Sequence, residues 1–287
     1  MNTLEFTLVV AAGSFVAGML GALTGLGGGV VIVPLLTLVF GVDIRYAIGA
    51  SLVSVIATSS GAAAAYLKEG YSNMRVGMFL EMATTAGALS GAFIAGYVST
   101  SAIAIIFGVV LLYSAYTSFG GPKEPEKGLA ADRVATFLRL DGTFPADRAR
   151  GAAEDSTERE AYHVRNVPAG FSLMYVAGVL SGLLGIGSGA VKVLAMDQAM
   201  KIPFKVSTTT SNFMIGVTAA ASAGIYLRRG YIDPALALPV MLGVLAGALV
   251  GALILPGAKV RSLRIVFGTV IAALGVQMIL EGIRGKL

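Results

Sequence analysis

Long apolar runs arranged in two matching sets constrain this chain more than any other feature. A helix needs roughly 20 mostly apolar residues to cross about 30 Å of hydrocarbon. Each half of the chain holds four such runs, with a shorter apolar piece between the first and second. The runs lie at 4–23, 47–67, 76–98 and 102–119, then at 171–184, 206–227, 234–255 and 263–283, and the shorter pieces at 30–40 and 190–200. They predict an all-α polytopic membrane protein with five helical segments in each half.

The two halves are related by an internal repeat. A shift of 160 residues places 15–117 on 175–277 without a gap, with roughly a quarter of the aligned residues identical. Glycine-rich and aromatic stretches are among the matches, 25–29 with 185–189 and 66–71 with 226–231. Because an odd number of crossings turns the second copy over, we predict two five-segment inverted-topology repeats, 1–119 and 169–287. A short piece that does not cross would instead leave the copies parallel.

Composition removes several classes of function. The chain is 56% hydrophobic and 13% charged, with a mean hydropathy of +0.81, against roughly 45–50% and 25% in soluble domains. It has no Cys and one His, which excludes disulfides, thiolate metal sites and cysteine nucleophiles. We therefore expect no catalytic centre, no metal and no cofactor. The basic residues behind the net charge of +5 lie between the apolar runs. There they orient a chain in the lipid bilayer and do not indicate a nucleic-acid partner.

A charged linker at 120–168 separates the halves. It holds eight basic and nine acidic residues, and we expect it to be flexible apart from a short helix near 132–140. His163 is expected to be an exposed loop residue. With five crossings per half, the short loops on the linker's side hold seven Lys and Arg residues against five on the other side. The positive-inside rule then makes the linker cytoplasmic and both termini periplasmic.

Two glycine clusters open the shorter apolar pieces. Gly25-Leu26-Gly27-Gly28-Gly29 and Gly185-Ile186-Gly187-Ser188-Gly189 are expected to break their helices, and the freed amides need partners in hydrocarbon. The start of the next helix presents unpaired N–H groups and a positive dipole, which together can bind an anion. We predict a midplane site formed by Gly27, Gly28 and Gly29 with Gly187, Ser188 and Gly189. The alternative is that these glycines only let helices pack closely.

Four polar side chains are candidates to complete this site. Lys192 lies inside an apolar piece, where it would add a positive charge, or alternatively snorkel or pair with Asp197. Ser51 and Ser211 are matched by the repeat, and each would either donate to an anion or bond its own helix. Glu81 is a candidate for proton coupling, against the alternative that it lies at the interface near Arg75.

The chain resembles the sulfite exporter TauE/SafE family of membrane transporters. The resemblance rests on the stretches 25–34 (GLGGGVVIVP) and 47–52 (AIGASL) and on their degenerate second copies at 185–189 and 207–212. It covers the whole chain except the linker, which is longer than we expect for the family. It implies passage of sulfite, sulfoacetate or other organosulfonates across a bacterial inner membrane.

We therefore expect a secondary transporter that exports a small sulfur-containing anion by alternating access. Two alternatives stay open at this point. A passive anion channel would share the glycine site but would not show saturable exchange. A membrane enzyme or a non-transporting assembly factor would show no solute flux, and an enzyme would need a reactive polar cluster. A homodimer is compatible with the sequence.

Overall fold

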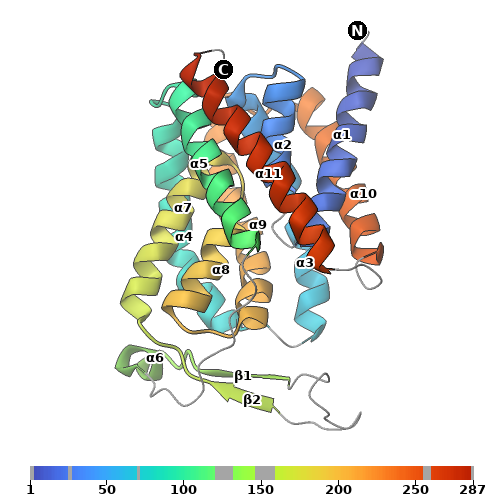
Figure 1. Cartoon of the computed structure of the whole chain (residues 1–287). Helices are drawn as coiled ribbons and strands as arrows, with labels where there is room; N and C mark the ends of the chain where they lie inside the picture. The colour runs from blue at the N-terminus through green and yellow to red at the C-terminus, as the bar shows by residue number, and fades with distance from the viewer. Residues whose placement is uncertain are drawn as a thin grey trace.

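The computed structural model describes residues 3–24, 28–69, 72–119, 132–145, 159–254 and 260–285. Its helices lie where the apolar runs predict them (Figure 1), and the all-α polytopic architecture is confirmed. The first half comprises α1 (Thr3–Thr24), α2 (Gly29–Pro34) with the π-helical turn η1 (Leu35–Val39), α3 (Ile44–Glu69), α4 (Met74–Ala95) and α5 (Thr100–Phe119). The second comprises α7 (Val167–Leu184), α8 (Gly189–Leu194) with η3 (Ala195–Ala199), α9 (Phe204–Arg228), α10 (Pro234–Ile254) and α11 (Val260–Ile283).

Length and hydropathy single out the helices suited to crossing a bilayer. Among the described residues, four segments are long and apolar enough: Met74–Ala95, Thr100–Thr117, Val167–Leu184 and Pro234–Gly251. Shorter apolar segments lie in α1, α2 with η1, α3 and α11. The two short helices α2 and α8 each continue into a five-residue π-helical turn at matching repeat positions. Such local widening of a helix is frequent at functional sites.

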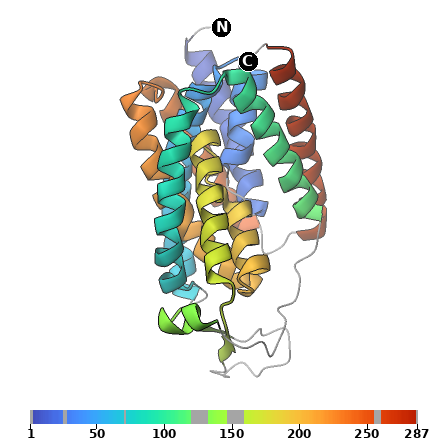
Figure 2. The ribbon, with the colours of Figure 1, turned by 90° about the vertical axis from the view of Figure 1, so that its left-hand side faces the viewer.

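Helices of the two halves pack against one another in a two-fold pattern. α1 packs on α10 as α7 packs on α4, while α3 meets α9 and α5 meets α11. Adding 160 to the residue numbers of α1 gives α7, and subtracting 160 from those of α10 gives α4, while α3 with α9 and α5 with α11 are each a pair of repeat mates. Figures 1 and 2 place both termini at one end, with α1 running away from that end and α7 running toward it. This is the arrangement that inverted halves would produce, and the orientation of each half in a membrane stays a prediction.

Glycines at matching positions allow these close approaches. A Cβ built on Gly87 of α4 would lie 2.1 Å from the carbonyl oxygen of Tyr175, and one on Gly247 of α10 would lie 1.9 Å from that of Phe15. Gly247 lies 160 residues after Gly87, and Tyr175 lies 160 residues after Phe15, so the two contacts are repeat mates. Only a residue without Cβ lets the backbones approach so closely. Glycines therefore allow close helix packing in the same way in both halves, as their spacing in the sequence predicts.

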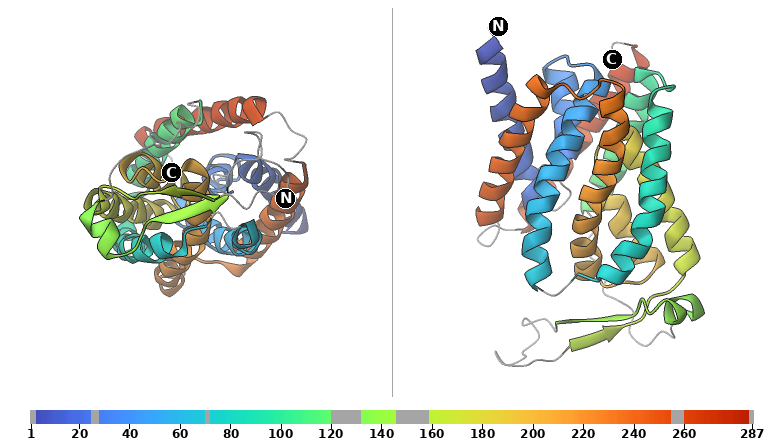
Figure 3. Two further views of the ribbon diagram at one scale, coloured as in Figure 1. Left: turned by 90° about the horizontal axis from the view of Figure 1, so that it is seen from below. Right: turned by 180° about the vertical axis from the view of Figure 1, so that it is seen from behind.

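The described part of the linker is folded, which differs from the flexible chain that its composition suggests. α6 (Arg133–Phe137) falls in the region where a short helix is predicted, and β1 (Gly142–Pro145) pairs antiparallel with β2 (Arg159–Tyr162). Figure 3 shows the hairpin lying across the lower end of the bundle. Its strands have four residues each, too few to give a recognisable alternation in the sequence. The adjacent ends of the helices supply the apolar surface that holds the segment.

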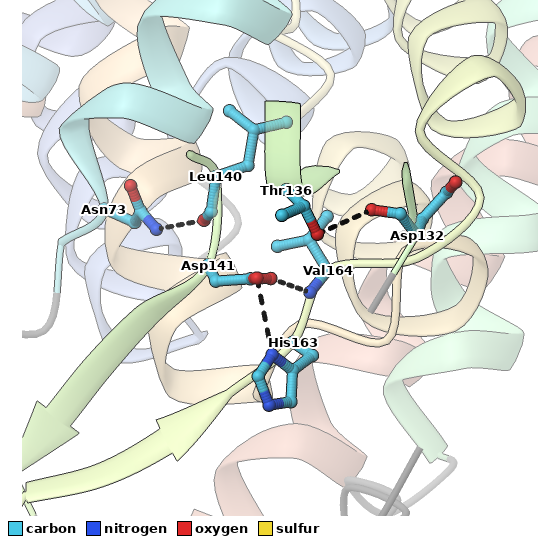
Figure 4. Close-up of polar contacts among 7 residues, drawn as sticks. All are labelled: Asn73, Asp132, Thr136, Leu140, Asp141, His163 and Val164. Atoms are coloured by element: carbon cyan, nitrogen blue, oxygen red, sulfur yellow. Dashed lines mark hydrogen bonds and ion pairs between the residues drawn. The ribbon is translucent and has the colours of Figure 1, made fainter. Parts of the chain in front are cut away.

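Buried apolar side chains and polar contacts attach the linker to α4. Leu140 and Val164 are buried in a core cluster with Val76 of α4. Figure 4 shows Asn73, the N-cap of α4, donating its amide to the Leu140 carbonyl at 3.0 Å. In the same view Asp141 accepts the Val164 N–H at 2.8 Å, and its other oxygen lies 3.3 Å from Nδ1 of His163.

The attachment extends to a buried tyrosine. The Tyr162 hydroxyl lies 2.6 Å from the Asn73 amide nitrogen. Burial raises the pKa of Tyr162 to about 12, against the lowering effect of the Asn73 hydrogen bond. The phenol is therefore neutral at physiological pH. His163 is half exposed, as predicted, but it is paired with Asp141.

Candidate functional site

The second glycine cluster interrupts its helix as predicted. α7 ends at Leu184 and α8 begins at Gly189. Between them, Gly185 and Gly187 have φ of +68° and +69°, and Ser188 has φ of +46°. The Gly185 N–H donates to the Ser181 carbonyl at 2.8 Å, which closes the helix with a left-handed cap. Left-handed backbone requires glycine or imposes strain on other residues, so this cluster does more than provide space for packing.

The first glycine cluster is described only in part. α1 ends at Thr24 and α2 begins at Gly29. Gly28 has an ordinary helical backbone, with φ of −67°. A Cβ on Gly28 would lie 2.9 Å from a methyl of Val244, so this position is limited by space. Gly27, one of the predicted site residues, lies outside the described residues.

The two interruptions meet beside α3. The hydroxyl of Ser51 in α3 donates to the carbonyl of Gly185 at 2.9 Å. A Cβ on Gly29 would lie 2.9 Å from this hydroxyl oxygen and 3.4 Å from the Gly185 carbonyl oxygen. Val55, one turn further along α3, lies within 3.3 Å of the Cβ position of Gly187 and 2.8 Å of that of Gly29. The start of α2 and the break before α8 therefore share one set of neighbours.

Both predicted hydroxyls bind carbonyls of the second interruption. Ser51 binds Gly185, and Ser211 of α9 donates to the Gly189 carbonyl at 3.3 Å. A serine hydroxyl has one proton to donate, and in this conformation both protons are engaged with backbone. Their direct donation to an anion stays a prediction, and it requires these bonds to be released. Among their neighbours, Thr208 and Thr209 bind carbonyls of their own helix, at 2.9 and 3.0 Å.

A buried charged group lies beside the second interruption. Lys192 is 0% exposed, and its ammonium donates to the Thr218 hydroxyl of α9. The Thr218 oxygen lies 2.7 Å from Oε1 of Glu81 in α4, which also accepts the Thr85 hydroxyl at 3.0 Å. We call Lys192, Thr218 and Glu81 the buried triad. Lys192 therefore does not snorkel to the surface, and Glu81 extends into the bundle.

The sequence did not reveal Thr218 as the link in this triad. Thr218 stands out in the sequence only as the repeat mate of Thr58. No spacing rule relates positions 81, 192 and 218, because the packing of α4 and α8 against α9 brings them together. The only usable signal was that two charged residues occur inside apolar segments, where an unpaired charge is expensive and a partner must exist.

Two buried polar atoms near the triad have no hydrogen-bond partner among the described residues. They are the Ser188 hydroxyl oxygen and Oε2 of Glu81, and their residues are 2% and 8% exposed. An unsatisfied buried polar group costs about 1–3 kcal/mol, so each of these atoms needs a partner such as a water, an ion or a substrate. Ser188 is the N-cap residue of α8, and its carbonyl accepts the N–H of Lys192 at 3.0 Å.

Electrostatically, this arrangement suits an anion. The first turn of α8 presents N–H groups that have no acceptor within the helix, and the Lys192 ammonium adds a full positive charge one turn later. Glu81 offsets that charge through Thr218. Among the described residues, no three His, Asp or Glu side chains come together to hold a metal ion.

Comparisons with known proteins agree with this description. The family model "Sulfite exporter TauE/SafE" matches residues 10–278. The chain is 27% identical to the "Probable membrane transporter protein YunE" of Bacillus subtilis (strain 168), over 98% of this chain and 99% of that protein. It is 24% identical to the "Probable membrane transporter protein MJ0441" of Methanocaldococcus jannaschii, over 93% and 92%. No solved structure matches the chain.

Proposed function

Because the chain belongs to the sulfite exporter TauE/SafE family, we propose that it exports small sulfur-containing anions by alternating access. Membership in the family and the names of the relatives make it a multi-pass membrane transporter. The proposal adds the substrate class, which comprises sulfite, sulfoacetate and other organosulfonates. It also adds the bacterial inner membrane, with the linker cytoplasmic and both termini periplasmic, and a transport role without enzymatic activity.

The observation that carries the proposal is the fully buried Lys192 at the start of the interrupted helix. A sulfonate or sulfite group has three oxygens, and an ammonium has three donors. The first N–H groups of α8 and the unpartnered Ser188 hydroxyl lie on the same stretch of backbone and would satisfy the remaining oxygens. With one ammonium proton engaged by Thr218, Lys192 keeps two donors for a compact anion, whose charge it also matches.

Two further features favour a carrier over a channel. Lys192, Ser188 and Glu81 are all buried, so the proposed site is closed to solvent in this conformation. A carrier passes through such a closed state, whereas a conducting channel needs a continuous path. The two interruptions also meet beside α3, where two similarly packed halves would rock against each other. Gly28 and Gly29, the N-cap and first residue of α2, would line the opposite side of the site.

Counterflow in liposomes tests the function. Purified protein is reconstituted with unlabelled sulfite or methanesulfonate inside, and uptake of the labelled anion is followed. We expect saturable uptake that is accelerated by the internal anion. The double variant Lys192→Met/Glu81→Gln, which removes both charges together so that neither is left unpaired, should abolish it. Ile32→Met changes the matching residue of α2 and should leave it intact.

The other outcomes separate the alternatives. Flux that neither saturates nor responds to the internal anion would identify a passive channel. The absence of any flux of either anion in the wild type would point to a non-transporting assembly factor. Flux in the double variant equal to that of the wild type would show that the buried charges take no part in transport.

A further inference from the structure

The buried triad contains two opposite charges that are joined through one hydroxyl. The Lys192 ammonium donates to Thr218, and Thr218 lies 2.7 Å from the Glu81 carboxylate. With Lys192 protonated and Glu81 ionised, the triad is neutral. Adding an anion at Lys192 would leave one net negative charge among buried side chains, which a low-dielectric interior strongly disfavours.

In the described structure, the hydrogen bonds to the Glu81 carboxylate come from two uncharged hydroxyl groups. From α8 it meets Lys192, from α9 Thr218, and on its own helix Thr85. Arg75, six residues earlier on α4, is exposed. Thr84 is a further buried hydroxyl on α4, and it donates to the Glu81 carbonyl at 3.2 Å.

The helix α7 also packs on α4, which it approaches through small residues. A Cβ on Gly178 would lie 2.2 Å from the carbonyl oxygen of Thr84, one turn from Glu81. The nearest titratable group on this helix face, Tyr175, is exposed and hydrogen-bonds Ser90 at 3.1 Å. On α9, Lys205 and Arg228 lie at the two ends of the helix, far from Thr218. Within the described part of the chain, the negative charge of Glu81 is therefore balanced by the positive charge of Lys192.

Thr218 is placed to serve both protonation states of Glu81. Its oxygen lies 2.7 Å from Oε1 of Glu81 and 2.8 Å from the Met214 carbonyl oxygen, yet its hydroxyl has one proton to donate. When Glu81 is ionised, Thr218 donates to the carboxylate. When Glu81 is protonated, the carboxyl group donates to Thr218, which turns its own proton to Met214. Lys192 donates to Thr218 in both cases, and no heavy atom has to move.

From this geometry, and resting on the anion transport proposed above, we infer that Glu81 carries one proton with each monovalent anion. The proton passes from water to the Glu81 carboxylate as the anion binds at Lys192, and it leaves Glu81 for water on the side where the anion is released. The triad is neutral when empty and neutral when it holds both anion and proton. A proton alone or an anion alone leaves a net buried charge, so the two move together.

The test uses methanesulfonate, because the anion of a strong acid keeps its single negative charge across the pH range of the experiment. Any proton that moves with it is then carried by the protein. Proteoliposomes contain a pH-sensitive dye, and the membrane potential is clamped. We expect one proton to enter for each methanesulfonate, and an imposed pH gradient to drive accumulation of the anion against its concentration gradient.

Two variants assign the proton to Glu81. Glu81→Gln keeps the shape of the side chain and resembles the protonated state, so methanesulfonate counterflow should persist while proton movement and pH-driven accumulation are lost. Asp197→Asn removes a carboxylate from η3 of the same interrupted segment and should keep the wild-type stoichiometry. Comparing the two variants shows whether proton movement depends on the Glu81 carboxylate in particular or on any carboxylate in these helices.

Each result is decisive. Wild-type methanesulfonate flux without proton movement, or unchanged stoichiometry in Glu81→Gln, overturns the inference while anion transport stands. If the wild type shows no counterflow of methanesulfonate or sulfite, the proposed function itself has failed. The wild-type stoichiometry gives an answer even where Glu81→Gln does not insert into the membrane.

Discussion

The two halves of this protein share a scaffold but differ in the chemistry of one place. The repeat offset relates the buried triad to a second set of positions on α2, α3 and α10. These mates of Lys192, Thr218 and Glu81 are Ile32, Thr58 and Met241. Ile32 is as fully buried as Lys192, and Thr58 binds the Ser54 carbonyl of its own helix at 3.0 Å. Matching positions of the repeat therefore hold two charged side chains, Lys192 and Glu81, in one place and the apolar Ile32 and Met241 in the other.

This difference indicates that helix packing and the chemistry of the buried triad place separate constraints on the sequence. The glycine approaches between helices recur in both halves with nearly the same geometry, as Gly178 against Thr84 and Gly18 against Val244 show, at 2.2 and 2.3 Å. A carrier with two similar halves needs matching shapes to rock between states, whereas one ion-binding group suffices for one anion. Four sets of substitutions test this separation, in decreasing order of expected effect.

Moving the charge to the other half should have the largest effect. Ile32→Lys buries an ammonium at a fully buried position where Met241 offers no carboxylate, and we expect a loss of about 3–5 kcal/mol of stability or failure to fold. The double variant Ile32→Lys/Met241→Glu supplies a partner and should recover part of the loss. Thermal unfolding of the purified protein in detergent measures both. A stable Ile32→Lys protein would mean that α2 lies in a more polar environment than the structure gives it.

Enlarging matched glycines should affect both halves alike. Gly87→Ala and Gly247→Ala each force a methyl group against a backbone carbonyl, at 2.1 and 1.9 Å, and we expect each to lower stability by about 1–3 kcal/mol. Gly224→Ala in α9 is the control, because nothing lies within 4 Å of its Cβ position and alanine favours a helix. Thermal unfolding reports all three. Loss of stability in one of the matched pair alone would break the symmetry of the scaffold.

Removing the matched hydroxyls should have an intermediate effect. Ser51→Ala and Ser211→Ala each leave a buried carbonyl of the second interruption without its donor, which costs about 1 kcal/mol. Ser51 should matter more, because its bond is shorter and joins the two halves. Stability is measured together with affinity for methanesulfonate. Stability that falls with unchanged affinity would limit both hydroxyls to a structural role.

Ser188→Gly should have the smallest effect and the opposite sign. Glycine adopts the left-handed backbone of this residue without the strain of about 1 kcal/mol that a side chain imposes there. We therefore expect a melting temperature that is unchanged or slightly raised. Affinity for methanesulfonate should fall several-fold, because the unpartnered hydroxyl is lost. An affinity equal to that of the wild type would exclude the Ser188 side chain from the site.

Much of the fold was predictable from sequence, because bilayer thickness fixes helix length and the repeat fixes the count. The interruption at Gly185 and the burial of Lys192 follow from the same reasoning: several glycines break a helix, and a charge in hydrocarbon needs a partner. The identity of that partner was not predictable. It depends on how α4 and α8 pack on α9, and Thr218 looks like an ordinary helical threonine in the sequence. The linker hairpin was not predictable because its strands have only four residues each.

Direct calorimetric titration of the purified protein with methanesulfonate tests the central claim most directly. We predict saturable binding of one anion per chain in the wild type and in Ile32→Met. In Lys192→Met, affinity should be weaker by about 100-fold or more, because a buried charge-assisted contact is removed. Equal affinity in Lys192→Met and the wild type would contradict the claim that the anion is held by the charge beside the second interruption.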